Sequence, residues 1–164
     1  MNDLNHIAFI MDGNGRWGLK KKKSRNYGHL AGVKTVQKIV EASVFFKVPI
    51  ISFYVFSSEN WKRPKSEINY LFNLISLYFT KEINNLIKNN IKIIISGRLK
   101  NLPVNIKGIL KKTINKTRKN NKLTVNLAIN YGSKNEIIDA VRKINNNFQR
   151  VTETNINKNL YSNL

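Results

Sequence analysis

Four short apolar runs rich in β-branched residues alternate along the chain with longer segments whose apolar residues recur every three to four positions. The runs, which predict strands, cover about residues 6–11, 50–56, 91–96 and 123–129. Helices are expected over about 30–46, 66–89 and 103–119, and the capping-box sequence Ser133-Lys134-Asn135-Glu136 predicts the start of another. Strands and helices alternating at this spacing predict right-handed βαβ units. The expected fold is therefore α/β, a mainly parallel sheet with helices on both faces.

The segment 66–89 is apolar over more than a narrow stripe. An ordinary core helix explains this pattern. The alternative is that this helix, the helix at 30–46 and the sheet enclose an elongated apolar tunnel. The pattern alone leaves both interpretations open.

Length and composition narrow the class of protein. The chain has 164 residues, no cysteine and two histidines, His6 and His29. One domain over 1–164 is expected from the length, disulfides and thiolate sites are excluded, and a histidine-built zinc site is not favoured. The longest apolar stretch, near 48–56, is too short to span a bilayer, and no signal pattern opens the sequence. A cytoplasmic location is therefore expected.

The formal net charge is +20, from 29 Lys+Arg against 9 Asp+Glu. Such an excess normally indicates a polyanionic partner such as nucleic acid, an acidic membrane or phosphorylated substrates. Here the lysines are scattered among many asparagines, a bias that an A/T-rich coding sequence also produces. No nucleic-acid recognition motif accompanies them, so a specific nucleic-acid partner is not predicted.

The segment from His6 to Trp17 combines a strand, a carboxylate and a turn. Its apolar run ends at Asp12, and two glycines then bracket Asn14 ahead of Arg16. Glycines allow a sharp turn whose N–H groups approach a ligand closely, and the carboxyl end of a parallel strand is where α/β sheets bind ligands. A carboxylate beside N–H donors and an arginine suits a metal-bridged phosphate. A simple Gly-rich hairpin is the alternative.

A second group of polar residues, Ser57-Ser58-Glu59-Asn60-Trp61-Lys62-Arg63-Pro64, follows the second strand. In a parallel sheet it opens on the same edge as Asp12. Between the two groups, the segment from Arg25 to His29 leads into the first predicted helix, whose N-terminus favours an anion. One crevice holding all three segments is expected.

These motifs resemble those of the cis-prenyltransferases, the undecaprenyl diphosphate synthase family. The matching segments are 6–17, Arg25, Gly28-His29, 57–64 and 126–132. The resemblance implies transfer of isopentenyl units from isopentenyl diphosphate onto an allylic diphosphate, with farnesyl diphosphate as the expected acceptor, to make a long cis-polyprenyl diphosphate. It also implies Mg²⁺, a homodimer and peripheral contact with a membrane. Val55, Ile91 and Leu123 would face the far end of the tunnel.

The resemblance also assigns roles by position. Asp12 and Asn60 are the candidate catalytic residues, and Asp12 is the magnesium ligand. The candidate substrate-binding residues are Gly13, Asn14, Gly15, Arg16, Trp17, Arg25, His29, Ser57, Ser58, Glu59, Trp61 and Arg63. Because an amide is a poor base, Asn60 is expected to orient groups. The proton lost from the isopentenyl unit would pass to a phosphate oxygen or through Ser57 and Asp12.

The chain departs from the family pattern in its last part. Family members carry an Arg-x-Ser/Gly-Gly-Glu-type motif for isopentenyl diphosphate after the segment matched here, and nothing after Gly132 supplies it. Glu136 is explained by helix capping. Arg98 and Ser133-Lys134 are smaller departures that are expected to be tolerated. The alternatives left open are an inactive or partial fragment, or one part of a split or heteromeric enzyme.

Overall fold

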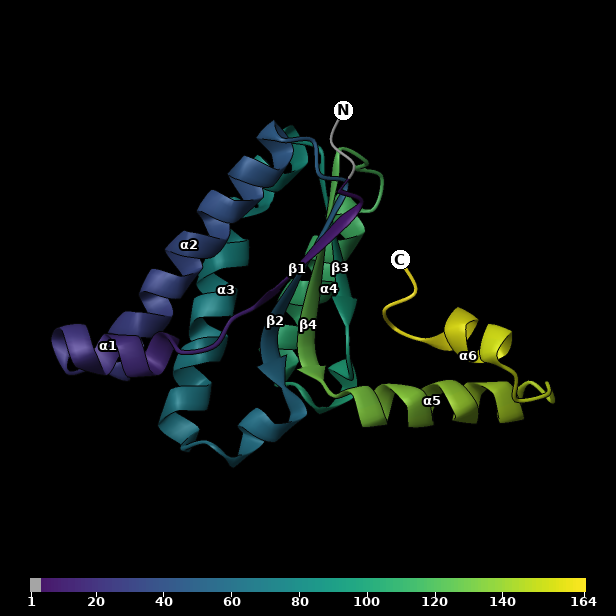
Figure 1. Ribbon diagram of the computed structural model, residues 1–164. Coiled ribbons are helices and arrows are strands. Elements are labelled where there is room, and N and C mark those ends of the chain that lie inside the picture. Colours follow the sequence, from purple (N-terminus) through teal and green to yellow (C-terminus); the bar gives the residue numbers. More distant parts are fainter. Residues whose placement is uncertain (1–3) are drawn as a thin grey trace.

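A four-stranded parallel sheet forms the centre of the computed structural model, which describes residues 4–164 apart from the side chain of Lys22 (Figure 1). The strand order is β1-β2-β4-β3. The strands are β1 (His6–Ile10), β2 (Ile50–Ser57), β3 (Ile91–Ser96) and β4 (Leu123–Tyr131). All three pairings are parallel, which confirms the predicted α/β class.

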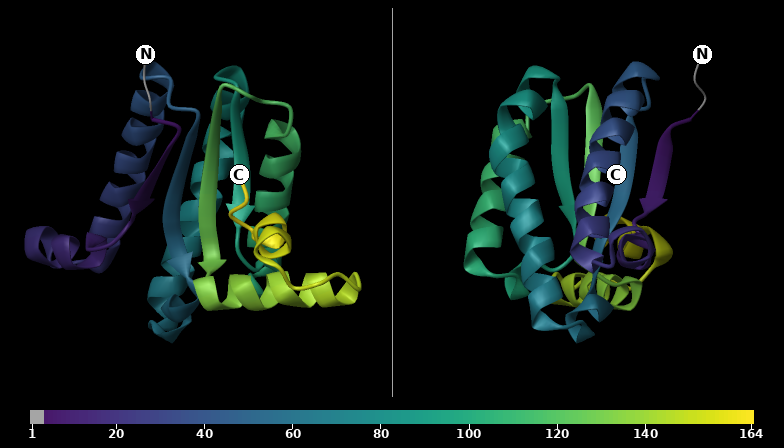
Figure 2. Two further views of the ribbon diagram at one scale, coloured as in Figure 1. Left: turned by 45° about the vertical axis from the view of Figure 1, so that its right-hand side comes forward. Right: turned by 90° about the vertical axis from the view of Figure 1, so that its left-hand side faces the viewer.

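Helices connect the strands and lie on both sides of the sheet. They are α1 (Asn14–Lys22), α2 (Arg25–Phe45), α3 (Lys65–Lys88), α4 (Val104–Thr117), α5 (Ser133–Asn146) and α6 (Glu153–Asn159), with short 3-10 turns η1 (Ser58–Lys62) and η2 (Leu99–Asn101). Helices α2, α3 and α4 lie on one side of the sheet (Figure 2). Helices α5 and α6 lie on the other side, beyond the carboxyl ends of the strands. No helix among residues 4–164 is long and apolar enough to cross a membrane.

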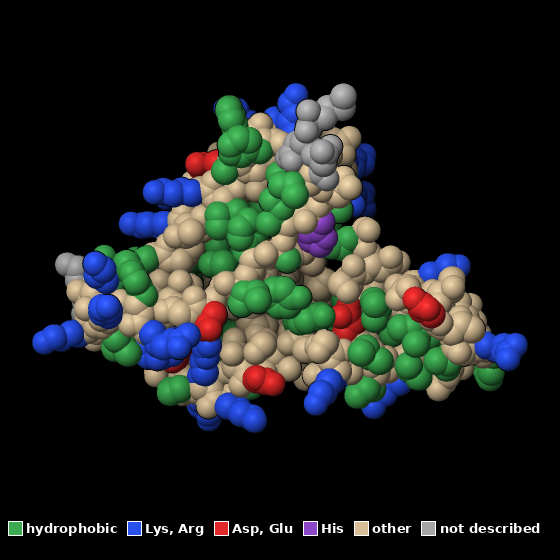
Figure 3. Space-filling view, viewed as in Figure 1, with side chains coloured by type: hydrophobic (Ala, Val, Ile, Leu, Met, Phe, Trp, Pro, Cys, Tyr) green, Lys and Arg blue, Asp and Glu red, His purple; other side chains and the backbone are tan. Residues whose placement is uncertain are grey.

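The core lies between the sheet and helices α2, α3 and α4. Alternate strand residues point into it because successive side chains of a strand face opposite sides. Phe53 of β2, Leu123 of β4 and Leu110 of α4 are fully buried there. The opposite face of the sheet is partly open, so Ile10 remains 79% exposed. Apolar side chains gather over this face and over α5 and α6, whereas Lys and Arg lie mostly around the outline (Figure 3).

Helix boundaries differ from the sequence prediction in the first part of the chain. Residues 14–22 form helix α1, where the sequence predicted only a turn at the glycines on either side of Asn14, and α2 begins at Arg25 rather than near residue 30. Gly13 adopts φ 82° as the N-cap residue of α1, a left-handed conformation that glycine accepts without strain. The side chain of Ser24 caps α2 by accepting a hydrogen bond from the Tyr27 N–H. A short connection containing Gly13 therefore joins β1 to α1, and a second one, ending at Ser24, joins α1 to α2.

The predicted capping box at Ser133–Glu136 is wrong. Gly132 is the N-cap residue of α5, and no side chain caps it. The Glu136 carboxylate is buried and instead accepts hydrogen bonds from the Tyr131 hydroxyl at 2.6 Å and from the Ser162 N–H at 2.8 Å. Glu136 thus fastens the segment after α6 to the end of β4.

Strand β3 is an edge strand, and α4 supplies part of its missing pairing. The Ile93 N–H donates to the Thr117 hydroxyl at 3.1 Å, and the Asn120 side chain donates to the Ile91 carbonyl at 2.7 Å. Unpaired edge groups are otherwise a template for aggregation. Thr117, the last residue of α4, and Asn120, in the turn after it, therefore satisfy backbone groups on the free edge of β3.

Candidate active site

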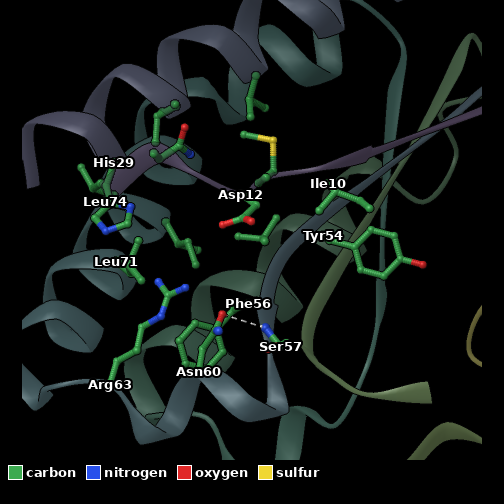
Figure 4. Close-up of a pocket in the computed structure, with 17 residues that line it drawn as sticks. Ile10, Asp12, His29, Tyr54, Phe56, Ser57, Asn60, Arg63, Leu71 and Leu74 are labelled. Atoms are coloured by element: carbon green, nitrogen blue, oxygen red, sulfur yellow. Dashed lines mark hydrogen bonds between the residues drawn. The ribbon is translucent and has the colours of Figure 1, made fainter. Parts of the chain in front are cut away.

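A cavity of about 350 Å³ lies between the carboxyl ends of β1 and β2 and helices α2 and α3 (Figure 4). One part of its lining is polar, with Asp12, Asn14, His29, Ser57, Asn60 and Arg63. The other part is apolar, with Ile10, Met11, Val33, Val36, Val55, Phe56, Leu71, Leu74 and Ile75, and it also includes Gly32 and Tyr54. The helix–sheet enclosure considered for the segment 66–89 is therefore present, at the size of a small-ligand pocket.

Asp12 follows β1 directly, and its carboxylate points into the cavity (Figure 4). Its Oδ1 accepts a hydrogen bond from the Gly13 N–H at 2.5 Å, and its Oδ2 accepts one from Arg16 at 3.2 Å. The side chain is 72% exposed. It is therefore open to a ligand or a metal ion.

Helix α1 is held against α2 by glycines that permit very close contact. A Cβ on Gly28 would lie 1.8 Å from the Asn14 backbone oxygen, and one on Gly32 would lie 2.5 Å from the Asn14 side-chain nitrogen. A larger residue at Gly28 would displace the α1 backbone, whereas one at Gly32 would displace the Asn14 side chain. In the sequence, Gly28 was notable only because it matches the family motif. In the structure, its lack of a side chain lets α1 pack closely on α2, which places Asn14 at the cavity.

The turn η1 arranges the second group of polar residues. The Asn60 Oδ1 accepts a hydrogen bond from the Ser57 N–H at 3.1 Å, and the Ser57 side chain accepts one from the Asn60 N–H, which completes a capping box. This pair of bonds fixes both side chains at the end of β2. Its geometry agrees with an orienting role for Asn60.

Glu67, in the first turn of α3, joins three cationic candidates and was missed by the sequence analysis. Its carboxylate accepts hydrogen bonds from Arg25 at 2.9 and 3.2 Å, from His29 at 3.1 Å and from Arg63 at 3.1 Å. The residue is only 7% exposed. The one sequence signal was its position four residues after Arg63, although Arg63 lies at the end of η1 with an extended backbone and not on α3.

Burial and these contacts change the pKa of two groups. Burial lowers the pKa of His29, and neighbouring Arg63 and Arg25 lower it further, although the contact with Glu67 opposes them. Burial alone would raise the pKa of Glu67, but the hydrogen bonds from Arg25 and His29 outweigh it and lower that pKa. Near neutral pH the site therefore holds an ionised Glu67 and a neutral His29, whose Nε2–H donates because a carboxylate only accepts.

Six of the predicted site residues line the cavity: Asp12, Asn14, His29, Ser57, Asn60 and Arg63. The others are not part of its lining: Gly13, Gly15, Arg16, Trp17, Arg25, Ser58, Glu59 and Trp61.

Both tryptophans pack against protein. Trp17 stacks on Tyr27, with ring centroids 5.7 Å apart. Trp61 donates to the Asn130 side chain at 2.8 Å and packs on Phe56 and Phe72. In this structure, Trp61 thus links η1 to β4.

The arrangement suits an amphipathic anion. Arg63, Arg25 and the N–H groups of the first turn of α1 offer donors to a phosphate, and the apolar walls suit a hydrocarbon tail. Among residues 4–164 no group of three or more His, Asp or Glu side chains is placed to hold a metal ion. A single carboxylate is nevertheless enough for Mg²⁺ when phosphates and waters supply the remaining ligands, and Asp12 is accessible for that purpose.

Comparisons with known proteins show the family of the chain. Residues 10–164 match the prenyltransferase family model described as putative undecaprenyl diphosphate synthase. The chain is 41% identical over 158 residues to an isoprenyl transferase of Fusobacterium nucleatum, covering 96% of this chain and 69% of that protein. It is 38% identical to an isoprenyl transferase of Rickettsia felis, covering 98% and 69%.

Solved structures are similar throughout the chain. A probable undecaprenyl diphosphate synthase from Campylobacter jejuni gives a TM-score of 0.84 at 34% identity, covering 100% of this chain and 72% of that one. Lavandulyl diphosphate synthase from Lavandula x intermedia, in complex with dimethylallyl diphosphate, gives a TM-score of 0.91 at 21% identity, covering 98% of this chain and 72% of that one. At that identity the second likeness supports the fold alone. The sequence, the fold and the cavity lead to one conclusion: the chain belongs to the undecaprenyl diphosphate synthase family of prenyltransferases.

Proposed function

We propose that the cavity binds an allylic diphosphate, with farnesyl diphosphate as the starting acceptor, and extends it with isopentenyl diphosphate into a long cis-polyprenyl diphosphate. The observation that carries this proposal is that one cavity is lined both by polar and charged side chains and by apolar ones. A prenyl diphosphate needs both kinds of contact, because a charged head is joined to a hydrocarbon tail. A volume of about 350 Å³ is suited to a short prenyl chain, since pockets for small ligands measure ~300–1,000 Å³.

In this mechanism the allylic carbon–oxygen bond breaks, and its electron pair leaves with the diphosphate. The double bond of the isopentenyl unit supplies the electron pair of the new carbon–carbon bond, and loss of one proton from that unit restores a double bond. Arg25, Arg63 and Arg16 stabilise the departing charge through N–H donors, and the N–H groups at the start of α1 add to them. Val33, Leu71 and Leu74 keep water from the hydrocarbon chain. Asn60 and Ser57 orient the isopentenyl unit, whose proton passes to a phosphate oxygen or through Ser57 and Asp12.

Prenyltransferases of this family generally require a divalent metal ion. We propose Mg²⁺ with Asp12 as its protein ligand, on the basis of the exposed carboxylate at the cavity. When bound, the ion neutralises diphosphate charge. A homodimer is also proposed, because Ile137, Ile138 and Phe148 leave an apolar surface around α5 exposed. Binding at the periphery of a membrane follows from the long apolar product.

The test compares wild type with Asp12→Ala in the presence of Mg²⁺, farnesyl diphosphate and isopentenyl diphosphate. We expect Asp12→Ala to lose about 100-fold or more in turnover, as for other groups that stabilise developing charge, while calorimetry still detects farnesyl diphosphate binding. Glu41→Ala, on the exposed side of α2, is the control and should behave as wild type. Normal turnover in Asp12→Ala would contradict the assignment of Asp12, and a wild-type chain that does not bind farnesyl diphosphate would contradict the proposed function.

A further inference from the structure

One buried carboxylate, that of Glu67, contacts three side chains outside α1 that the family resemblance assigns to diphosphate binding. Arg25 and His29 come from α2, Arg63 comes from the end of η1, and Glu67 comes from α3. Ion pairs of 2.9 and 3.1 Å join Arg25 and Arg63 to Glu67, and a hydrogen bond of 3.1 Å joins the neutral His29 to it. The site thus contains the negative charge of Glu67 although the proposed ligand, a diphosphate, is also negatively charged.

We infer that Glu67 is a positioning residue, which holds Arg25, His29 and Arg63 in the arrangement that receives the diphosphate without itself contacting that ligand. The inference rests on the proposed function, because it gives these three side chains a diphosphate to bind. It concerns a residue outside the cavity lining, so its role is exerted through its partners.

Glu67 is more deeply buried than the two arginines that it contacts. The side chain of Glu67 is 8% exposed, whereas those of Arg25 and Arg63 are 43% and 33% exposed. Each guanidinium has five N–H donors. Glu67 takes two from Arg25 and one from Arg63. Both arginines therefore keep free donors on their accessible sides while their buried sides are fixed.

The hydrogen-bond pattern requires a carboxylate. Oε1 accepts from Arg25, His29 and Arg63, and Oε2 accepts from Arg25. In a glutamine one of these oxygens becomes an NH₂ group, which is a donor facing donors. A glutamine of the same shape therefore releases at least one cation, and it also removes one negative charge from the site.

These two effects of Glu67→Gln act in opposite directions on ligand affinity. If Glu67 only neutralised charge, its removal would make the site more positive and would tighten the binding of an anion. If Glu67 positions the cations, the released side chains must be ordered again at a cost in entropy, and binding weakens. The sign of the change in affinity separates the two roles.

The experiment measures the affinity of inorganic pyrophosphate for the whole chain by calorimetry, with wild type, Glu67→Gln and Glu82→Gln. Glu82 lies on the same helix and accepts a hydrogen bond only from Asn85 among the contacts that the structure records for residues 4–164, so its variant matches the change in charge away from the site. We expect Glu67→Gln to bind at least tenfold more weakly than wild type, and Glu82→Gln to stay within twofold. Equal or tighter binding by Glu67→Gln would overturn the inference.

Thermal melts of all variants show whether each of them folds. A third variant, Glu67→Asp, keeps the inference testable if Glu67→Gln does not fold. Aspartate keeps the charge but is one methylene shorter, so it reaches fewer partners, and we expect an affinity between those of wild type and Glu67→Gln. If Glu67→Gln does not fold, the aspartate variant decides: binding at least threefold weaker than wild type supports the positioning role, and unchanged binding overturns it. Failure of the wild type to bind pyrophosphate would instead reject the proposed diphosphate site, and with it this role for Glu67.

Discussion

At the scale of residues, one ion pair, between Arg98 and Asp139, helps to hold the last part of the chain in place. Arg98 donates to both carboxylate oxygens of Asp139, at 2.6 and 2.7 Å, and the Tyr161 hydroxyl donates to the same group. The hydrogen bonds from Arg98 are the main cause that lowers the pKa of Asp139 to about 2. Arg98 was a departure from the family pattern, and in this structure it has a bidentate partner.

Asp139→Asn should therefore change how stability depends on pH. Because the pKa of Asp139 in the folded chain, about 2, lies below the unfolded value of 3.8, the ionised pair stabilises the fold above about pH 4, and this contribution disappears as the pH falls towards 2. At pH 6 the variant should lose about 1 kcal/mol in free energy of unfolding, discounted for partial exposure. Urea denaturation between pH 2 and 6 measures the difference, with Glu41→Gln as the control. A gap between wild type and Asp139→Asn that stays constant with pH would reject this account.

At the scale of elements, the site depends on the contact between α1 and α2. The position of Asn14 follows from the absence of a side chain at Gly28. Gly28→Ala should cost about 2 kcal/mol in free energy of unfolding, because its methyl group overlaps the Asn14 backbone. It should also weaken pyrophosphate binding, since α1 moves away from the cavity.

Gly108→Ala is the matched control for that prediction. Gly108 lies in α4, and a Cβ there meets no atom within 4 Å. Alanine should stabilise this helix by about 1 kcal/mol and leave pyrophosphate binding unchanged. Chemical denaturation and calorimetry give both quantities. Equal effects of the two alanine substitutions on binding would show that the α1–α2 contact does not control the site.

For the whole molecule, we predict that the volume open to the growing chain sets the length of the product. Val55, on β2, was expected to face the tunnel and lines the cavity. Ile91 and Leu123 do not line it; they pair at the start of β3 and β4 and are buried in the core, so the expectation that they face its far end differs from the structure. Each methylene-sized group that enters the cavity gains about 0.8 kcal/mol, and growth becomes unfavourable once the cavity is filled.

Val55→Phe should then shorten the product distribution, because it removes volume from the cavity. Leu123→Ala should cost about 2–5 kcal/mol of stability, as for other large-to-small core substitutions, and leave product length unchanged. Mass analysis of the products, together with thermal melts, distinguishes the two effects. Longer products from Leu123→Ala would show that the cavity extends into the core during reaction.

The alternation of apolar runs and helical patterns was sufficient to predict the parallel sheet. Because parallel strands align their carboxyl ends, it also predicted that Asp12 and Ser57 would meet at one edge. These are local signals, since hydrophobic periodicity and the alternation of strands and helices along the chain need no knowledge of distant partners. The helix at residues 14–22 was missed because its glycines favour turns in isolation, and its packing on α2 decides otherwise. Glu67 contacts Arg25 and His29 across 42 and 38 residues, and Glu136 reaches Ser162 across 26. Only the tertiary structure could decide those pairings, because a buried carboxylate takes whichever donors the packed elements bring within about 3 Å.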